Sequence, residues 1–153
     1  MKKVLVTGVS GFIGQHCAAE LLKNGYAVKG SVRSFSRTEE VTKGIKTIID
    51  PKGNFEFVEL NLLKDEGWEE AMQGCEFVLH VASPYVMTEP KDENELIKPA
   101  VEGTLRTLKA AKKAGVKRIV VTSSMVSMLG GVNGSISINQ DSWSNVNAKH
   151  ASA

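Results

Sequence analysis

The chain has 153 residues, a formal net charge of +2 and a hydrophobic content of 42%, which suit a single globular domain with its own core. The small and dispersed positive charge argues against a nucleic-acid partner. No apolar run is long enough for a signal peptide or a membrane span. Cys17 and Cys75 lack the clustered spacing of a metal site, which favours reduced thiols. We therefore expect a cytoplasmic protein with no bound metal and no membrane partner.

Segments with the hydrophobic pattern of strands alternate with segments that have the pattern of helices. We expect strands over residues 4–6, 26–32, 55–60, 77–81 and 117–123. We expect helices from residue 12 to a stop at Asn24-Gly25, and over residues 36–49, 65–72 and 93–114. Beyond Met125 both periods fade, and the glycines of residues 130–134 indicate a loop.

The alternation of five strands with helices, through short connections, predicts a parallel sheet with helices on both faces. We predict a Rossmann-type, doubly wound α/β fold with strand order 3-2-1-4-5, which ends after the fifth strand. In the longest helix, Pro99 either breaks or restarts the helix, since it supplies no N–H. Four apolar residues of this helix share one face and are expected to pack inward: Ile97, Val101, Leu105 and Leu108.

Three glycines follow the first apolar strand at intervals of three residues: Gly8, Gly11 and Gly14. Between a buried strand and an amphipathic helix, this pattern is typical of a dinucleotide-binding turn. The first glycine allows the tight turn, the second lets the backbone approach a pyrophosphate, and the third packs the helix on the sheet. The alternative is a glycine-rich loop used only for packing. The predicted phosphate site comprises Thr7, Gly8, Ser10, Gly11, Phe12, Ile13 and Gly14.

Arginine occurs where an NAD-binding sheet usually carries a carboxylate for the ribose 2′-hydroxyl, at the end of the second strand. The segment 30–37 contains Arg33 and Arg37 and no Asp or Glu. A guanidinium can bind a 2′-phosphate through paired, charge-assisted hydrogen bonds. The sequence therefore predicts NADP as the cofactor. The alternative is that one or both arginines are solvated loop charges.

The remaining predicted strands also end in residues suited to a ligand site. Asn61 could either meet the adenine edge or form a turn, and both readings stay open. Small residues after the fourth strand would let the backbone run close to the cofactor. The residues assigned to these strand ends are Asn61, Leu62, Ala82, Ser83, Pro84, Thr122 and Ser123.

Five segments together resemble the extended short-chain dehydrogenase/reductase family, in its dihydroflavonol-reductase and cinnamoyl-CoA-reductase branch. They are residues 7–14 (TGVSGFIG), 31–34 (SVRS), 77–84 (FVLHVASP), 99–104 (PAVEGT) and 121–124 (VTSS). The resemblance implies an NADPH-dependent reductase of ketones or aldehydes, which also acts in reverse as an alcohol dehydrogenase. Asn61 departs from the Asp that the family often has, and Arg106 stands where relatives often carry Asn.

In that family, a serine after the fifth strand acts with a tyrosine and with a lysine four residues beyond it. Ser124 matches the serine, which implies that its hydroxyl holds the substrate oxygen during hydride transfer. Neither tyrosine of the chain completes the motif, because Lys29 follows Tyr26 after three residues and Glu89 is the fourth residue after Tyr85. The tail over residues 141–153 resembles the family's approach to the missing tyrosine.

We therefore interpret residues 1–153 as one incomplete NAD(P)-binding Rossmann domain without a substrate domain, nearly inactive alone. The unpaired edge of the fifth strand predicts self-association. One alternative is a noncatalytic NADP-sensing module, which the missing tyrosine favours. Another is an NAD-dependent sugar-nucleotide epimerase or dehydratase, which fits Arg33 poorly.

Overall fold

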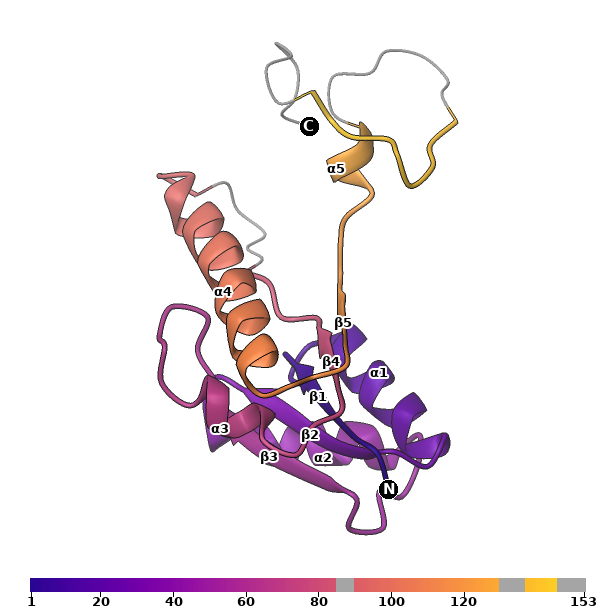
Figure 1. The fold of residues 1–153 in the computed structure, drawn as a ribbon. Helices are drawn as coiled ribbons and strands as arrows, with labels where there is room; N and C mark the ends of the chain where they lie inside the picture. Colours follow the sequence, from indigo (N-terminus) through magenta and orange to yellow (C-terminus); the bar gives the residue numbers. More distant parts are fainter. Residues whose placement is uncertain (85–89, 130–136, 146–153) are drawn as a thin grey trace. The chain divides into compact units, whose positions relative to one another are not determined.

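A computed structural model of the protein describes residues 1–84, 90–129 and 137–145 (Figure 1). The chain divides into two compact units, residues 1–121 and 122–153, and each is described by itself. The first unit contains β1 (Lys3–Thr7), α1 (Phe12–Lys23), β2 (Ala27–Val32), the 3-10 turn η1 (Phe35–Arg37), α2 (Thr38–Lys46), β3 (Phe55–Glu59), α3 (Trp68–Met72), β4 (Phe77–His80), α4 (Asn94–Lys113) and β5 (Arg118–Val121).

The five strands form one parallel sheet in the order β3-β2-β1-β4-β5. In the centre of this sheet, Val6 lies between Gly30 of β2 and Leu79 of β4. The predicted Rossmann-type fold and strand order are confirmed. Because all strands are parallel, their carboxyl ends gather at one edge, where such sheets bind ligands.

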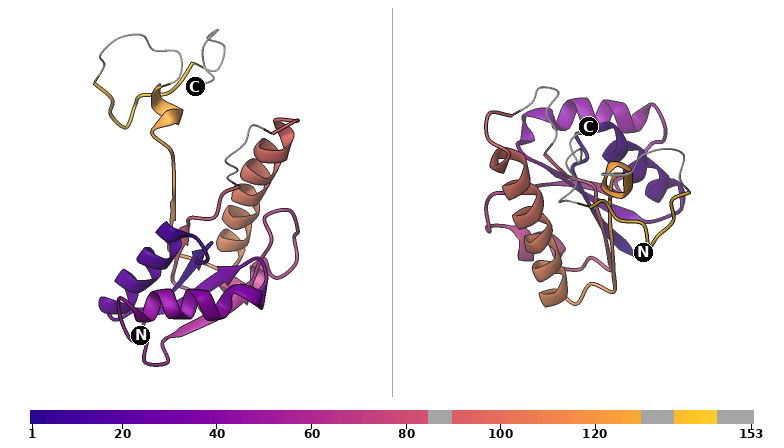
Figure 2. Two further views of the ribbon diagram at one scale, coloured as in Figure 1. Left: turned by 180° about the vertical axis from the view of Figure 1, so that it is seen from behind. Right: turned by 90° about the horizontal axis from the view of Figure 1, so that it is seen from above.

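Both faces of the sheet are buried against helices, with α1 and α2 on one face and α3 and α4 on the other (Figure 2). Alternate residues of β1 are buried in two separate hydrophobic cores, one on each face of the sheet. Val4 and Val6 pack with residues of α1 and α2, whereas Leu5 packs with residues of α3 and α4. Burial on both sides explains why the first strand is a continuous apolar run.

The ends of the helices follow local signals. After α1, Gly25 adopts φ +78°, and the amide of Tyr26 donates to the carbonyl of Leu21 at 3.0 Å, which closes the helix. Residues 35–37 form the separate turn η1, so α2 is shorter than predicted. The helix α4 continues through Pro99, whose ring is buried, and the proline therefore neither breaks nor restarts it.

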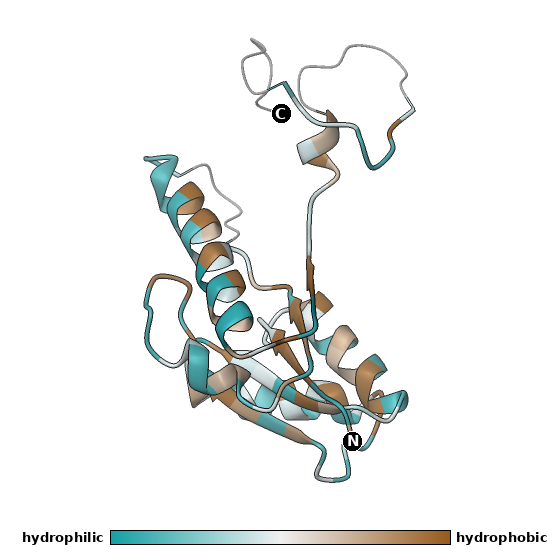
Figure 3. Cartoon of the chain, in the orientation of Figure 1, coloured by the Kyte–Doolittle hydropathy of each residue, from teal (hydrophilic) through white to brown (hydrophobic). Residues whose placement is uncertain are grey.

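The prediction for the inner face of α4 was wrong. The four apolar residues are substantially exposed: Ile97 49%, Val101 53%, Leu105 46% and Leu108 39%. In Figure 3, hydrophobic residues, shown in brown, recur along the length of α4. The buried face instead carries small residues together with Pro99: Gly103, Thr107, Ala110 and Ala111. The reason is a close approach, because a Cβ added at Gly103 would lie 2.6 Å from Cδ2 of Leu62. Small residues allow this contact, and branched apolar side chains do not.

The second unit contains one described helix, α5 (Val126–Leu129), in a segment for which no helix is predicted. The amide of Ser144 donates to the carbonyl of Ser127 at 2.9 Å, and its hydroxyl donates to the carbonyl of Val126 at 3.0 Å. The predicted loop at residues 130–134 and the tail at 148–153 lie outside the described residues. In the part of the chain that is described, none of the helices combines the length and the hydropathy that crossing a membrane demands.

The exposure of the apolar stripe on α4 is testable by substitution. We expect Leu105→Gln to change the free energy of unfolding by no more than about 0.5 kcal/mol, because Leu105 is 46% exposed and lies outside both buried cores. Met72→Ala, at the fully buried last residue of α3, should lower the free energy of unfolding by about 2–5 kcal/mol. Urea unfolding followed by circular dichroism measures both. A loss above 2 kcal/mol for Leu105→Gln, on the same scale, would contradict the assignment.

Candidate dinucleotide site

The turn after β1 is built by close backbone contacts that require glycine. Gly8 adopts φ +73°, and a Cβ added there would lie 2.9 Å from Cα of Ala82. A Cβ added at Gly14 would lie 2.3 Å from the carbonyl oxygen of Gly8. By contrast, the nearest atom to a Cβ at Gly11 is the same oxygen at 3.4 Å, and Gly11 is exposed. The backbone of the turn therefore requires glycine at positions 8 and 14. Gly11 is exposed, and a side chain there would fill the space in front of the turn.

Several backbone amides of this turn are held by the protein. The amide of Gly8 donates to Oγ of Ser31 at 3.2 Å, and the amide of Gly11 donates to the carbonyl of Gly8 at 3.0 Å. No hydrogen bond among the described residues uses the amides of Phe12 and Ile13, the first two residues of α1. The first amides of a helix have no partner within it, and the helix dipole makes this end positive. This arrangement suits a phosphate.

Thr7 joins the ends of β1 and β4 directly below the turn. Its Oγ1 accepts hydrogen bonds from the amides of Val81 and Ala82, each at 3.0 Å, and lies 3.0 Å from Nδ1 of His80. Thr7 itself is fully buried. Thr7 therefore makes its contacts within the protein, where its hydroxyl links the ends of β1 and β4; we call these contacts of Thr7 with Val81, Ala82 and His80 the clasp.

The two arginines predicted for the 2′-phosphate differ in their surroundings. Arg33 is exposed just after β2 and makes no hydrogen bond or ion pair with any residue that the structure describes. Arg37 already binds both carboxylate oxygens of Glu40, at 2.9 and 2.8 Å. This pair raises the pKa of Arg37 and lowers the pKa of Glu40. Arg33 is thus the freer of the two guanidinium groups.

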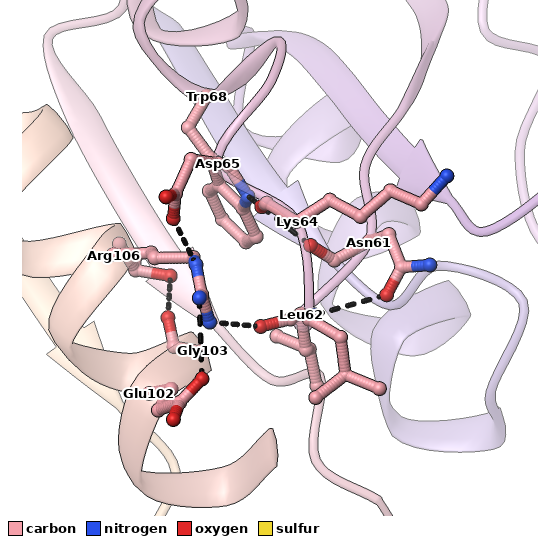
Figure 4. Close-up of polar contacts among 10 residues, drawn as sticks. Asn61, Leu62, Lys64, Asp65, Trp68, Glu102, Gly103 and Arg106 are labelled. Carbon is pink, nitrogen blue, oxygen red and sulfur yellow. Dashed lines mark hydrogen bonds and ion pairs between the residues drawn. The ribbon is translucent and has the colours of Figure 1, made fainter. Parts of the chain in front are cut away.

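The loop between β3 and α3, which carries Asn61 and Leu62, is locked from two sides (Figure 4). Oδ1 of Asn61 accepts the amide of Leu63 at 2.9 Å, which is a turn contact, and Nε1 of Trp68 donates to the carbonyl of Asn61 at 3.2 Å. The side-chain nitrogen of Asn61 makes no hydrogen bond to a described residue, so the turn reading and the adenine reading are compatible.

Arg106 of α4 holds the same loop from the other side, and the sequence alone gave no role for this residue. Its guanidinium donates to the carbonyl of Leu62 at 2.6 Å, to Glu102 at 3.2 Å and to the carboxylate of Asp65. These contacts raise the pKa of Arg106, first through Asp65. No sequence signal identifies the interaction, because Arg106 and Asp65 are 41 residues apart.

The other predicted site residues fall into two groups. Ala82 and Pro84 are half-buried and Ser83 is exposed after β4. Thr122, Ser123 and Ser124 belong to the second unit, where Oγ of Ser124 accepts the amide of Val126 at 3.3 Å and Oγ of Ser123 lies 3.4 Å from that of Ser127. Tyr85 and Glu89 lie outside the described residues. The described residues contain no group of three or more His, Cys, Asp or Glu side chains that could hold a metal ion.

Comparison with known proteins identifies the family. The profile of the NAD dependent epimerase/dehydratase family matches residues 4–150. The chain belongs to this family. Within it, the chain is 40% identical to dihydroflavonol 4-reductase from Hordeum vulgare, over 94% of this chain and 40% of that protein. It is 42% identical to the bifunctional dihydroflavonol 4-reductase/flavanone 4-reductase of Malus domestica, over 80% of this chain and 35% of that protein.

Solved structures give the same result for this family member. Yeast methylglyoxal/isovaleraldehyde reductase Gre2, complexed with NADPH, superposes with a TM-score of 0.80 at 30% identity, over 97% of this chain and 45% of the enzyme. Vestitone reductase from alfalfa superposes with a TM-score of 0.74 at 28% identity, over 96% of this chain and 44% of the enzyme. The predicted resemblance to reductases of the extended short-chain family is confirmed. The chain spans less than half of each of these relatives.

The two glycines of the turn should respond differently to an added methyl group. Gly14→Ala forces a Cβ against the carbonyl of Gly8, so we expect the free energy of unfolding to fall by about 1–3 kcal/mol. Gly11→Ala brings its Cβ no nearer than 3.4 Å to the carbonyl oxygen of Gly8, an ordinary van der Waals contact, so its effect should stay within about 0.5 kcal/mol. Urea unfolding of both variants measures the difference, and equal destabilisation would argue against the packing described here.

Proposed function

We propose that this chain is the NADP-binding part of an NADPH-dependent reductase that transfers hydride to a ketone or an aldehyde. The observation that carries the proposal is the glycine turn, whose free helix amides lie at the carboxyl edge of the sheet with Arg33 following the neighbouring strand. The cofactor fits this arrangement, because the turn leaves space at Gly11 that a side chain would fill. The NADPH complex of the yeast relative supports the same cofactor.

In this proposal the segments that follow β1, β2, β3 and β4 each bind one part of the cofactor. The amides of Phe12 and Ile13 receive the pyrophosphate at the positive end of α1. Arg33 receives the 2′-phosphate, and Asn61 and Leu62 border the adenine. The backbone at Ala82 and Ser83 runs beside the cofactor, held close to the turn by Thr7.

The chemical step is proposed for a longer protein that contains this chain, because the chain spans 40% of the barley relative. NADPH supplies the hydride when it is bound. Ser124 would hydrogen-bond the substrate oxygen, as in the related family, and a tyrosine outside this sequence would supply the proton.

The proposed location is the cytoplasm. Cys75 is buried and Cys17 is half-buried, and neither is part of a disulfide. Burial raises the pKa of the Cys75 thiol, which keeps it protonated and unreactive. Unpaired thiols are typical of reducing compartments.

Cofactor choice is tested by titrating the purified chain with NADP and with NAD in a calorimeter. We expect NADP to bind more tightly, and Arg33→Ala to weaken NADP by about 10- to 100-fold, because one charge-assisted phosphate contact is lost. NAD binding should be unchanged by the same substitution. As a matched control, Arg37→Ala should weaken NADP by no more than about threefold, since its guanidinium is occupied by Glu40. Equal affinity for NADP and NAD in the unmodified chain would refute the assignment.

We also propose that the chain self-associates through the outer edge of β5. This strand ends the sheet, and Val120 and Val121 are 53 and 41% exposed. The opposite edge strand β3 carries Glu56 and Glu59 instead. Charged residues protect an edge from pairing, and exposed apolar residues do not.

Sedimentation velocity over a range of concentrations tests this association. We expect dimers or larger species that decrease in Val120→Lys, because a charge on the edge disfavours pairing with a second copy. Leu105→Gln, on α4, should leave the distribution unchanged and so identifies the surface involved. A clean monomer at high concentration, or an effect confined to Leu105→Gln, would exclude association through β5.

A further inference from the structure

His80 is a buried histidine of β4 that the proposed cofactor contacts do not use. Its side chain is 3% exposed and is surrounded by threonine hydroxyls from β1 and α4. Nδ1 lies 3.0 Å from Oγ1 of Thr7 and 3.3 Å from Oγ1 of Thr107, and Nε2 lies 3.5 Å from Oγ1 of Thr104. The ring therefore contacts the hydroxyl of Thr7, which links the ends of β1 and β4.

The hydrogen-bond partners of the threonines determine which ring nitrogen carries the proton. Oγ1 of Thr7 already accepts two amide protons, from Val81 and Ala82, so its two lone pairs are used. Its own proton can therefore only be donated, and Nδ1 of His80 is the acceptor within reach. This requires a neutral ring with an unprotonated Nδ1.

The opposite side of the ring gives the same assignment. Oγ1 of Thr104 donates its proton to the carbonyl of Ala100 at 2.7 Å, so toward Nε2 it can only accept. Thr107 donates its proton to the carbonyl of Gly103 at 2.9 Å, so its 3.3 Å contact with Nδ1 is not a hydrogen bond when Nδ1 is unprotonated. The shorter contact with Thr7 and the contact with Thr104 together assign the neutral Nε2–H tautomer.

We infer that His80 is a positioning residue for the dinucleotide turn, acting through Thr7. The lone pair on Nδ1 takes the Thr7 proton and so leaves the Thr7 oxygen to hold the amides of Val81 and Ala82. These contacts keep Ala82 against Gly8, where the two backbones are too close for any side chain on Gly8. The inference rests on the proposed function, because the turn it positions is the proposed pyrophosphate site.

Protonation of His80 would reverse this arrangement. A proton on Nδ1 faces the proton of Thr7, so Thr7 must rotate and lose an amide contact. The neighbours on β1 and α4 are threonines, and β5 meets His80 by strand pairing at Val121, so none of these partners is a charged group that would stabilise the cation. Burial accordingly lowers the pKa of His80 below its ordinary value.

The direction of the pH effect follows from this shift. The unfolded chain takes up the proton before the folded chain does, near the ordinary histidine pKa of about 6.5. The stability contributed by the neutral ring is therefore complete above that pH and is lost as the pH falls below it. The affinity of the turn for NADP should fall only at a lower pH, where His80 takes up a proton in the folded chain.

The matched variants His80→Asn and His80→Leu test the inference, because they have similar shapes and differ in the acceptor. Oδ1 of asparagine can replace Nδ1 for Thr7 and does not titrate, whereas leucine offers no acceptor. In calorimetric titrations at pH 8 on protein checked for folding by circular dichroism, we expect His80→Leu to bind NADP about three- to tenfold more weakly than His80→Asn. A merely space-filling role would give equal affinities and would overturn the inference.

The pH profile and the tautomer complete the test. Between pH 8 and pH 5, the free energy of unfolding should fall more steeply for the unmodified chain than for His80→Asn, because only the histidine takes up a proton on unfolding. Identical profiles would refute the role of Nδ1. Long-range ¹H–¹⁵N spectra should show the Nε2–H tautomer without any nucleotide, and an Nδ1–H signal would also refute it. If the unmodified chain binds no NADP at pH 8, the proposed function fails, and the positioning role fails with it; an Nε2–H signal would then support the hydrogen-bond arrangement alone.

Discussion

The close approach of the turn after β1 to the end of β4 is the constraint on which the rest of the site depends. At Gly8 the backbone of Ala82 leaves no room for a side chain, and at Gly14 the helix α1 meets the turn itself. The hydroxyl of Thr7 maintains this approach with three polar contacts of 3.0 Å, and both Thr7 and His80 are buried. In a buried environment such contacts are costly to break, because each lost partner leaves a polar group unsatisfied. The proposed pyrophosphate site at the start of α1 depends on this geometry.

A large part of the fold follows from local sequence signals. The apolar runs, the glycine spacing and the helix stop at Gly25 are all short-range features, and they predict the strand order and the position of the turn. The inner face of α4 shows the limit of such reasoning. Two stripes of that helix satisfy a helical period, one apolar and one of small residues, and periodicity alone cannot decide which one packs. The decision depends on Leu62, which lies 41 residues before Gly103 in the chain and touches it in space.

The supporting residues of the site were the least predictable. Arg33 could be proposed from its position after β2, because sheets of this type use that position to bind the ribose. His80 and Arg106 could not be assigned a role, since each acts through partners that are remote in sequence: Thr7 for His80, and Leu62 and Asp65 for Arg106. Both hold backbone segments in place. Their chemistry becomes visible only when hydrogen-bond donors and acceptors are counted around them.

The exposure of the apolar face of α4 has a consequence for any longer polypeptide built on this sheet. Right-handed crossovers place the connection that leaves a fifth strand on the same side of the sheet as the connection that enters it. In a longer polypeptide, a helix that joins a fifth strand to a sixth parallel strand would therefore cover the same face of the sheet as α4. The four branched side chains from Ile97 to Leu108 give α4 an exposed apolar stripe of the kind that packs helix against helix.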